Sequence, residues 1–312
     1  MSRNYGLGQR DMTKAGQVAL NRLAGKGAIS LLTAATNGER WRLLVGWAKK
    51  HNVQKMENLT SELVRQYGEE LGYRVEDGDL ATATAHNYIS AINSVMTIAT
   101  GGAWKIISPT KDCGIKERSF IRDTQPGALN MNLYNQACQA VLDQEGERLL
   151  AILNLARHLG LRSKEASLLD ASVALKEAEN KKIITICDGT KGGRKRNVSI
   201  RLPDQIDALR SAANLQGKFK SVMDPDQNWQ TWREGPLRRA RELVKMNTGG
   251  GLHDLRSAFA CQRYFELTGH DAPCAGGKDI SPNVDKAARI EISNELGHSR
   301  VDITNEYLGK AS

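Results

Sequence analysis

The segment from Ala85 to Met96 repeats apolar residues every three or four positions, the spacing of one face of an α-helix. The same spacing occurs earlier, from Trp41 to Ala48 and from Leu59 to Leu71. Aromatic residues make up only 5% of the chain and apolar residues 40%, which favours helices with Leu, Ile and Ala cores over a β-sandwich. Ile- and Thr-rich residues 182–187, a turn, and residues 197–202 predict one β-hairpin. We therefore expect a mainly α fold with a small β-hairpin or sheet.

The length of 312 residues predicts two domains. The best candidate for a linker is Thr124-Gln125-Pro126-Gly127, because proline and glycine both interrupt regular structure. This gives an N-terminal helical domain, residues 1–125, and a C-terminal domain, residues 126–312.

The formal net charge is +9, which favours a polyanionic partner or simply aids solubility. The excess is shared between the two halves. Residues 1–125 carry 17 Lys and Arg against 12 Asp and Glu, and residues 126–312 carry 27 against 23. Such a distribution suits a duplex gripped from two sides, whereas a single basic tail would not produce it.

The helix predicted around Ala85–Met96 carries short polar side chains opposite its apolar stripe, with no Lys or Glu among them. Side chains of this kind can approach bases and phosphates closely, although a plain solvent-facing surface is the simpler interpretation. We favour a DNA-facing surface, formed by His86, Asn87, Ser90, Asn93, Ser94 and Thr97.

Five cysteines without a tight repeat suggest a reducing compartment and no disulfide framework. Cys261, His270 and Cys274 match no familiar zinc pattern, so we expect no metal site. The polar N-terminus and the lack of long apolar runs predict a cytoplasmic protein that does not contact membranes.

The C-terminal part gathers imidazoles, cations and a phenol within a short stretch. His253 and Arg256 are three residues apart and would share one helix face, and His298 precedes Tyr307 closely. Ser299 and Asp302 read as a capping box that would start a helix just before Tyr307. This combination suits a phosphodiester that is attacked by a tyrosine oxygen, since cations around a phenol make it a better nucleophile.

These residues make the chain resemble the tyrosine recombinase, or phage integrase, family. The resemblance rests on H-x-x-R at His253–Arg256, L-G-H at Leu296–His298, and Tyr307. Upstream, Leu159-Gly160-Leu161-Arg162 resembles the family's first arginine box, and Lys191 stands where its hairpin lysine would be. The ordered set covers about the last half of the chain.

The resemblance implies a role for each position. Tyr307 would attack the phosphate, Arg162 and Arg256 would clamp its non-bridging oxygens, and Lys191 would protonate the leaving 5′-oxygen. His253 would accept a proton or donate to the phosphate, and His298 would donate to a non-bridging oxygen. Glu165 would orient an arginine without touching the substrate. The basic residues next to Lys191 are expected to contact DNA phosphates: Arg194, Lys195 and Arg196.

The implied activity is site-specific recombination of double-stranded DNA through a 3′-phosphotyrosine and a four-way junction, without ATP, metal or other cofactor. The implied architecture is a helical core-binding domain and a mixed catalytic domain that clamp the DNA. The implied partners are specific recombination sites, three further copies in a homotetramer, and accessory DNA-bending proteins.

Two alternatives remain open at this stage. Relaxation of DNA in the manner of a type IB topoisomerase uses the same chemistry, and a catalytically silent DNA-binding accessory protein could keep the same fold. The chain also departs from the family pattern. Ser257 stands where many relatives have histidine, the segment between Phe265 and Ile292 is long, and only five residues follow Tyr307.

Overall fold

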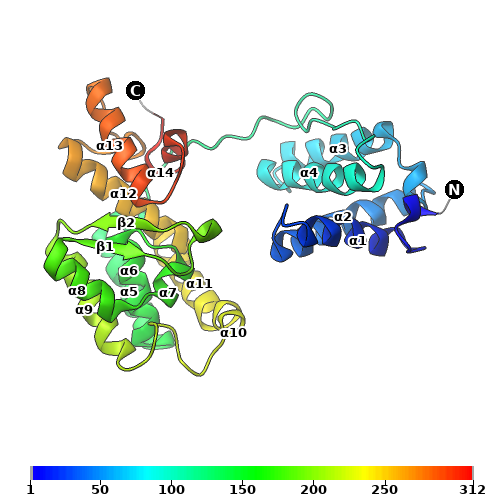
Figure 1. Ribbon diagram of the computed structural model, residues 1–312. Helices are drawn as coiled ribbons and strands as arrows, with labels where there is room; N and C mark the ends of the chain where they lie inside the picture. Colours follow the sequence, from blue (N-terminus) through cyan, green and yellow to red (C-terminus); the bar gives the residue numbers. More distant parts are fainter. Residues whose placement is uncertain (1–2, 311–312) are drawn as a thin grey trace. The chain divides into compact units, whose positions relative to one another are not determined.

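The computed structural model describes residues 3–310 and divides into two compact units, Met1–Ser119 and Phe120–Ser312. Each unit has its own apolar core, and no residue belongs to both cores. Figure 1 shows that helices dominate both units. The division falls slightly before the predicted linker. Pro126 and Gly127 instead open a packed turn, in which a Cβ at Gly127 would overlap the backbone of Thr248.

The first unit is built of four helices around Trp41, Ile89 and Ile92. Side chains of Asp11, Ser30 and Thr60 each accept a backbone N–H of the helix that follows, which explains where three of these helices start. The elements are η1 (Asn4–Gly6), α1 (Met12–Gly25), α2 (Leu31–Lys50), η2 (Met56–Asn58), α3 (Ser61–Glu76) and α4 (Thr82–Ala99).

The polar face of α4 is partly covered by the chain that follows it. Asn93 is buried, donates to the carbonyl of Ile107 at 2.8 Å, and accepts from its amide and from the Trp104 indole. His86 lies 2.9 Å from the carbonyl of Lys116. The prediction that Asn93 faces a DNA groove is therefore wrong, because its amide serves the loop. Of the same face, Ser90 is exposed and Asn87, Ser94 and Thr97 are half-buried.

The second unit packs helices around one two-stranded antiparallel sheet. Its elements are η3 (Gly127–Leu129), α5 (Met131–Glu145), α6 (Glu147–Leu159), α7 (Ser163–Leu168), α8 (Ala171–Lys181), β1 (Ile183–Ile186), η4 (Lys191–Gly193), β2 (Arg196–Ser199), α9 (Pro203–Gln216), α10 (Trp229–Glu234), α11 (Pro236–Thr248), α12 (Leu252–Thr268), η5 (Pro273–Ala275), α13 (Pro282–Glu295), η6 (Val301–Thr304) and α14 (Asn305–Leu308). The mainly α fold with a small hairpin is thus confirmed.

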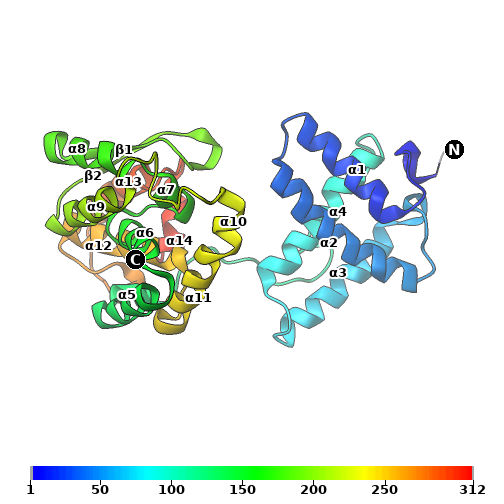
Figure 2. The same cartoon turned by 90° about the horizontal axis from the view of Figure 1, so that it is seen from below.

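The hairpin is held against the helices by its alternating apolar side chains. Ile184 pairs with Val198 and Ile186 with Arg196, and the three apolar members of these pairs are fully buried. Helix α8 packs on both α9 and β1, while α6 packs on α9 and α12 near the middle of the unit (Figures 1 and 2). This arrangement brings the turn of the hairpin, the end of α6 and the start of α12 toward one place.

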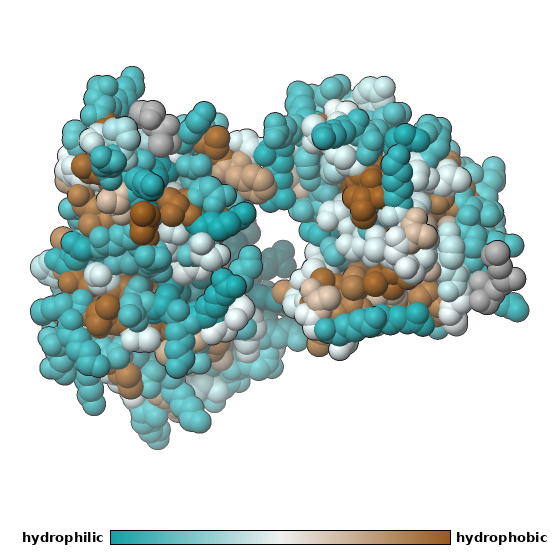
Figure 3. Space-filling view, turned by 45° about the horizontal axis from the view of Figure 1, so that its top comes forward, coloured by the Kyte–Doolittle hydropathy of each residue, from teal (hydrophilic) through white to brown (hydrophobic). Residues whose placement is uncertain are grey.

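The surface of both units is mainly hydrophilic on the face drawn in Figure 3, with apolar side chains in separate patches. No helix within residues 3–310 is long and apolar enough to cross a membrane.

Candidate functional site

Helix α12 supplies two of the predicted residues from its first turns. His253 and Arg256 lie on one face, as their spacing requires. The intervening Asp254 points elsewhere: it pairs with Arg122 at 2.5 Å and accepts the backbone N–H of Ala128. These contacts fix the start of α12 against residues 122–128, and with it the position of both predicted side chains.

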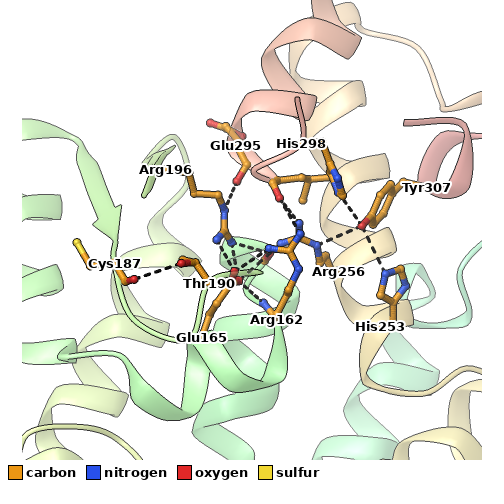
Figure 4. A network of polar contacts seen from close by, with 12 residues as sticks. Arg162, Glu165, Cys187, Thr190, Arg196, His253, Arg256, Glu295, His298 and Tyr307 are labelled. Atoms are coloured by element: carbon orange, nitrogen blue, oxygen red, sulfur yellow. Dashed lines mark hydrogen bonds and ion pairs between the residues drawn. The ribbon is translucent and has the colours of Figure 1, made fainter. Parts of the chain in front are cut away.

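The short α14 places Tyr307 against this helix. The Tyr307 hydroxyl lies 3.0 Å from Nε2 of His298, 3.4 Å from Nε2 of His253 and 3.5 Å from Nε of Arg256 (Figure 4). The His253 ring stacks on the tyrosine, with 5.3 Å between ring centres. The hydroxyl thus sits among two imidazoles and a guanidinium, all from the same chain.

The predicted capping box does not form. Residues 301–304 make the 3-10 turn η6, whose N-cap is Arg300 and not Ser299, and no side chain caps it. The structure instead holds α14 at its far end. Gly309, at φ +82°, passes between two backbone groups, because an added Cβ would lie 2.9 Å from both the Arg122 carbonyl and the Cys274 amide. The segment before Tyr307 is also held, because the Arg122 N–H donates to the Asn305 carbonyl and Arg289 donates to the side chains of Thr304 and Asn305.

Arg256 is almost fully buried beneath Tyr307. Its two terminal nitrogens donate to the carbonyls of Gly160 and Leu296, and its Nε faces the tyrosine oxygen. Burial, opposed by Tyr307 and assisted by Arg162, lowers the pKa of Arg256 to about 10. The guanidinium still carries its charge at neutral pH.

Arg162 stands at the N-terminus of α7 and reaches the same place from the opposite side. Its backbone N–H and its Nη1 each donate to Glu165 at 2.7 Å, and its side chain remains partly exposed. Glu165 itself is fully buried. Burial alone would raise the pKa of this carboxyl, but Arg196, Arg162 and Arg256 outweigh it and hold the pKa below its usual value.

The hairpin turn brings Lys191 to the rim. Gly189, at φ +71°, packs so tightly on the backbone of Lys164 and Glu165 that an added Cβ would lie 2.8 Å away. Lys191 in η4 is exposed beyond this contact. An open pocket of about 660 Å³ results, lined in part by Arg162, Lys191, His253, His298 and Tyr307.

Both histidines of the pocket are neutral at pH 7. Burial of the His298 ring, followed by the charge of Arg256, lowers its pKa to about 4. One edge of His253 is open to solvent, but desolvation of the stacked ring, then Arg256, lowers its pKa to about 4 as well. Neutral imidazoles within hydrogen-bond distance of a phenol can accept its proton.

The predicted basic contacts of the hairpin divide into two kinds. Arg194 and Lys195 are exposed and free to meet a polyanion. Arg196 is buried, with both terminal nitrogens on Glu165, and its Nε donates to the carbonyl of Glu295 at 2.6 Å. The prediction that Arg196 contacts DNA is wrong, because strand alternation turns it inward.

Two residues that support the site were missed from the sequence. Asp254 and Arg122 are more than a hundred positions apart, and neither belongs to a recognisable motif.

Cys261 and Cys274 were considered only as metal ligands. Their sulfurs lie 3.7 Å apart, and both approach the carbonyl of Tyr307. Within residues 3–310, no three His, Cys, Asp or Glu side chains are grouped so as to hold a metal ion.

Part of the sequence matches a known family model, and the fold is similar to that of several solved structures. The family model described as "Integrase" matches residues 120–262. The fold is similar to that of the Tn1549 transposon integrase in complex with transposon right end DNA, with a TM-score of 0.59, 10% identity, and 95% of each chain covered.

Two further solved structures share the fold. The XerH site-specific recombinase bound to difH substrate has a TM-score of 0.57 and 16% identity, covering 94% of this chain and 82% of that one. A lambda integrase tetramer bound to a Holliday junction has a TM-score of 0.55 and 15% identity, covering 92% and 77%. No curated protein matches the sequence.

Proposed function

We propose that the chain is a tyrosine recombinase, a site-specific DNA recombinase that cuts and rejoins DNA through Tyr307. The observation that carries the proposal is that the Tyr307 hydroxyl lies within hydrogen-bond distance of His298, His253 and Arg256. Tyr307 also lines a pocket together with Arg162 and Lys191. Arg162, Lys191 and Arg194 line the pocket against one exposed carboxylate, that of Glu306, and this excess of cations suits a phosphodiester.

The chemistry is a transesterification. The Tyr307 oxygen attacks the scissile phosphorus, its proton passes to His253, and the bond to the 5′-oxygen breaks. Lys191 gives that oxygen a proton, so a 3′-phosphotyrosine and a free 5′-hydroxyl result. The ester bond is exchanged for another ester bond, and the step therefore needs neither ATP nor a metal ion.

Arg162, Arg256 and His298 stabilise the charge that develops on the phosphorus oxygens. Donors fixed around the developing charge are worth about 10²–10³-fold in rate each. In the free protein, both terminal nitrogens of Arg256 donate to backbone carbonyls. Its Nε–H donates to the Tyr307 hydroxyl oxygen. We infer that a phosphate oxygen takes this position when DNA binds, which releases the hydroxyl for attack.

The partner is double-stranded DNA that carries specific recombination sites. Four chains on two sites would exchange strands through a four-way junction, with accessory DNA-bending proteins as further partners. The similar structure of a lambda integrase tetramer bound to a Holliday junction supports this assembly. Residues 120–312 act as the catalytic domain in this proposal, and the helical first unit binds the DNA core through exposed positions such as Ser90.

A suicide substrate tests the proposal. A nicked duplex taken from the DNA that flanks the gene is incubated with the protein in EDTA and run on a denaturing gel. We expect a covalent adduct with the wild type and none with Tyr307→Phe. Tyr134→Phe is a matched control, because it also removes one buried hydroxyl bond, to Asn154 at 2.6 Å, but on α5. An adduct that persists in Tyr307→Phe would disprove the assignment.

Strand exchange separates recombination from relaxation. Two labelled duplexes with the same site should yield recombinant products and junction intermediates. Relaxation of supercoiled DNA without any exchange would instead support an activity of the topoisomerase type.

A further inference from the structure

Arg196 lies where three segments of the site meet. It comes from β2, donates to the carbonyl of Glu295 at the end of α13 at 2.6 Å, and donates to the carbonyl of Gly160 at the end of α6 at 3.4 Å. Its side chain also lies under Gly297, where an added Cβ would be 2.7 Å from Arg196 Cδ. The three segments carry Lys191, His298 and Arg162. Figure 4 shows the Arg196 guanidinium between Glu295 and Glu165.

The contacts of Arg196 are adjacent to those of Arg256. Arg256 donates to Gly160 and to Leu296, while Arg196 donates to Gly160 and to Glu295. Arg196 therefore holds the Gly160 carbonyl, to which Arg256 also donates, and the residue next to Leu296, the other acceptor of Arg256. A change at Arg196 would move the carbonyls on which Arg256 rests.

The charge of Arg196 also has a defined partner. Its terminal nitrogens lie 2.7 and 2.8 Å from the two oxygens of Glu165. The same carboxylate binds Arg162 at 2.7 Å and lies 3.9 Å from Arg256. Without Arg196, a buried negative charge would be shared by these two arginines alone. Their stabilisation of the negative charge that develops on the phosphate in the transition state would fall accordingly.

We propose that Arg196 is a positioning residue of the cleavage reaction. It neutralises Glu165 and holds the Gly160 and Glu295 backbone, so that Arg162 and Arg256 direct their charge at the scissile phosphate. This inference rests on the proposed function, and it assigns to Arg196 a role in the rate of cleavage rather than in DNA affinity.

The first experiment separates rate from affinity in Arg196→Met, which keeps an unbranched apolar stem and removes the guanidinium. We expect the single-turnover cleavage rate at saturating DNA to fall about 100-fold, the usual loss for a preorganised charge. The dissociation constant for DNA should change less than about threefold, because a buried residue makes no phosphate contact. Arg201→Met is the matched control. It removes a nearby exposed pair with Glu291 and should leave the rate unchanged.

A second substitution distinguishes the electrostatic role from a structural one. Adding Glu165→Gln to Arg196→Met removes the uncompensated carboxylate and should restore the cleavage rate at least about tenfold. A residue that only stabilised the fold would give additive or larger losses. Arg196→Lys keeps a cation opposite Glu165 without reaching all three segments, and should lie between the wild type and Arg196→Met. It also serves if Arg196→Met does not fold.

A third measurement needs no DNA. NMR titration of His298 should show its pKa rising by about one unit in Arg196→Met, since a cation is lost and a carboxylate is uncovered. The pKa should return toward the wild-type value when Glu165→Gln is added. Arg201→Met should leave it in place.

The outcomes are distinguishable from failure of the proposed function. A wild type without adduct would count against the function and, with it, against a cleavage role of Arg196, whereas the His298 titration would still test the electrostatic effect of Arg196 and Glu165 on the pocket. Wild-type cleavage in Arg196→Met would overturn the inference while the function stands. So would a double variant no faster than Arg196→Met, or a His298 pKa that does not respond.

Discussion

Three histidines of the second unit are held in the neutral form by their surroundings. Burial first and Arg157 second lower the pKa of His158 to about 4. Burial first and Arg256 second lower the pKa values of His253 and His298 to about 4. His158 lies away from the pocket, beside Tyr134. It is therefore the histidine at which the effect of burial on stability can be measured without touching the site.

The pKa of His158 predicts a loss of stability in acid. The folded pKa of about 4 lies below the unfolded value of about 6.5, so the unfolded chain binds more protons between these limits. Stability is complete above pH 6.5 and falls as the pH drops toward 4. His158 alone should contribute about 1 kcal/mol of this loss at pH 5.5. Urea unfolding at pH 7.5 and 5.5 should show a smaller difference in His158→Gln, and equal differences would contradict the prediction.

Arg196 shows where inference from single residues ended. Its neighbours in the sequence, Arg194 and Lys195, are exposed, and a run of three cations is usually a solvated surface. Only the pairing of Ile186 with Arg196 reveals that this position faces the protein. The register of a short hairpin depends on the helices beneath it, which no local pattern encodes.

At the scale of elements, the turn after α6 is the most constrained point near the site. Gly160 adopts φ +62°, and an added Cβ would lie 2.4 Å from the Phe259 ring. Its carbonyl accepts from both Arg196 and Arg256. A side chain at position 160 would therefore strain the backbone and overpack Phe259, at the residue whose carbonyl binds both arginines.

Gly160→Ala should therefore destabilise the protein by about 2–4 kcal/mol, from left-handed strain and overpacking together. It should also lower the cleavage rate. Gly249→Ala is the control, since Gly249 is a left-handed helix end with open space around its Cα. That change should cost only about 1 kcal/mol and leave cleavage intact. Urea unfolding of both variants measures the loss in the free energy of unfolding. Equal losses in the two variants would contradict the prediction that a Cβ at position 160 overpacks Phe259.

Element boundaries are clearest where a residue dictates backbone geometry. Helices α9 and α11 begin at Pro203 and Pro236, because the fixed φ of proline suits the first position of a helix. The capping box at Ser299 failed because residues 301–304 form a 3-10 turn. There the chain is held by contacts with distant segments, since the Arg122 N–H donates to the Asn305 carbonyl and Arg289 donates to Thr304 and Asn305.

For the whole molecule, two separate cores predict two independently folding parts. No residue of one core belongs to the other. A fragment of residues 120–312 should unfold cooperatively and give a well-dispersed NMR spectrum. It should bind DNA at least about tenfold more weakly than the full chain, because it loses one set of phosphate contacts. A fragment that is unfolded, or that binds DNA as well as the full chain, would contradict this division.

The helical class of the fold and the grouping of the site could be read from periodicity and from the ordered short motifs. The placement of loops could not. Asn93 looked available for DNA because residues 103–117 carry no strong helical or strand pattern, yet they return to cover it. Long-range packing of irregular segments has no local signature.

The narrow passage at Gly309 bears on which chain of an assembly supplies the nucleophile. The chain directly after α14 is confined at Gly309 by the backbone of Arg122 and Cys274. The Tyr307 hydroxyl is also bonded to three side chains of its own chain, so we expect that the tyrosine does not extend to a neighbour's phosphate. Each protomer should cut in cis, at the phosphate that its own arginines hold. A mixture of Tyr307→Phe and Arg162→Ala chains should then remain inactive, whereas cleavage restored by mixing would show that tyrosines are exchanged in trans.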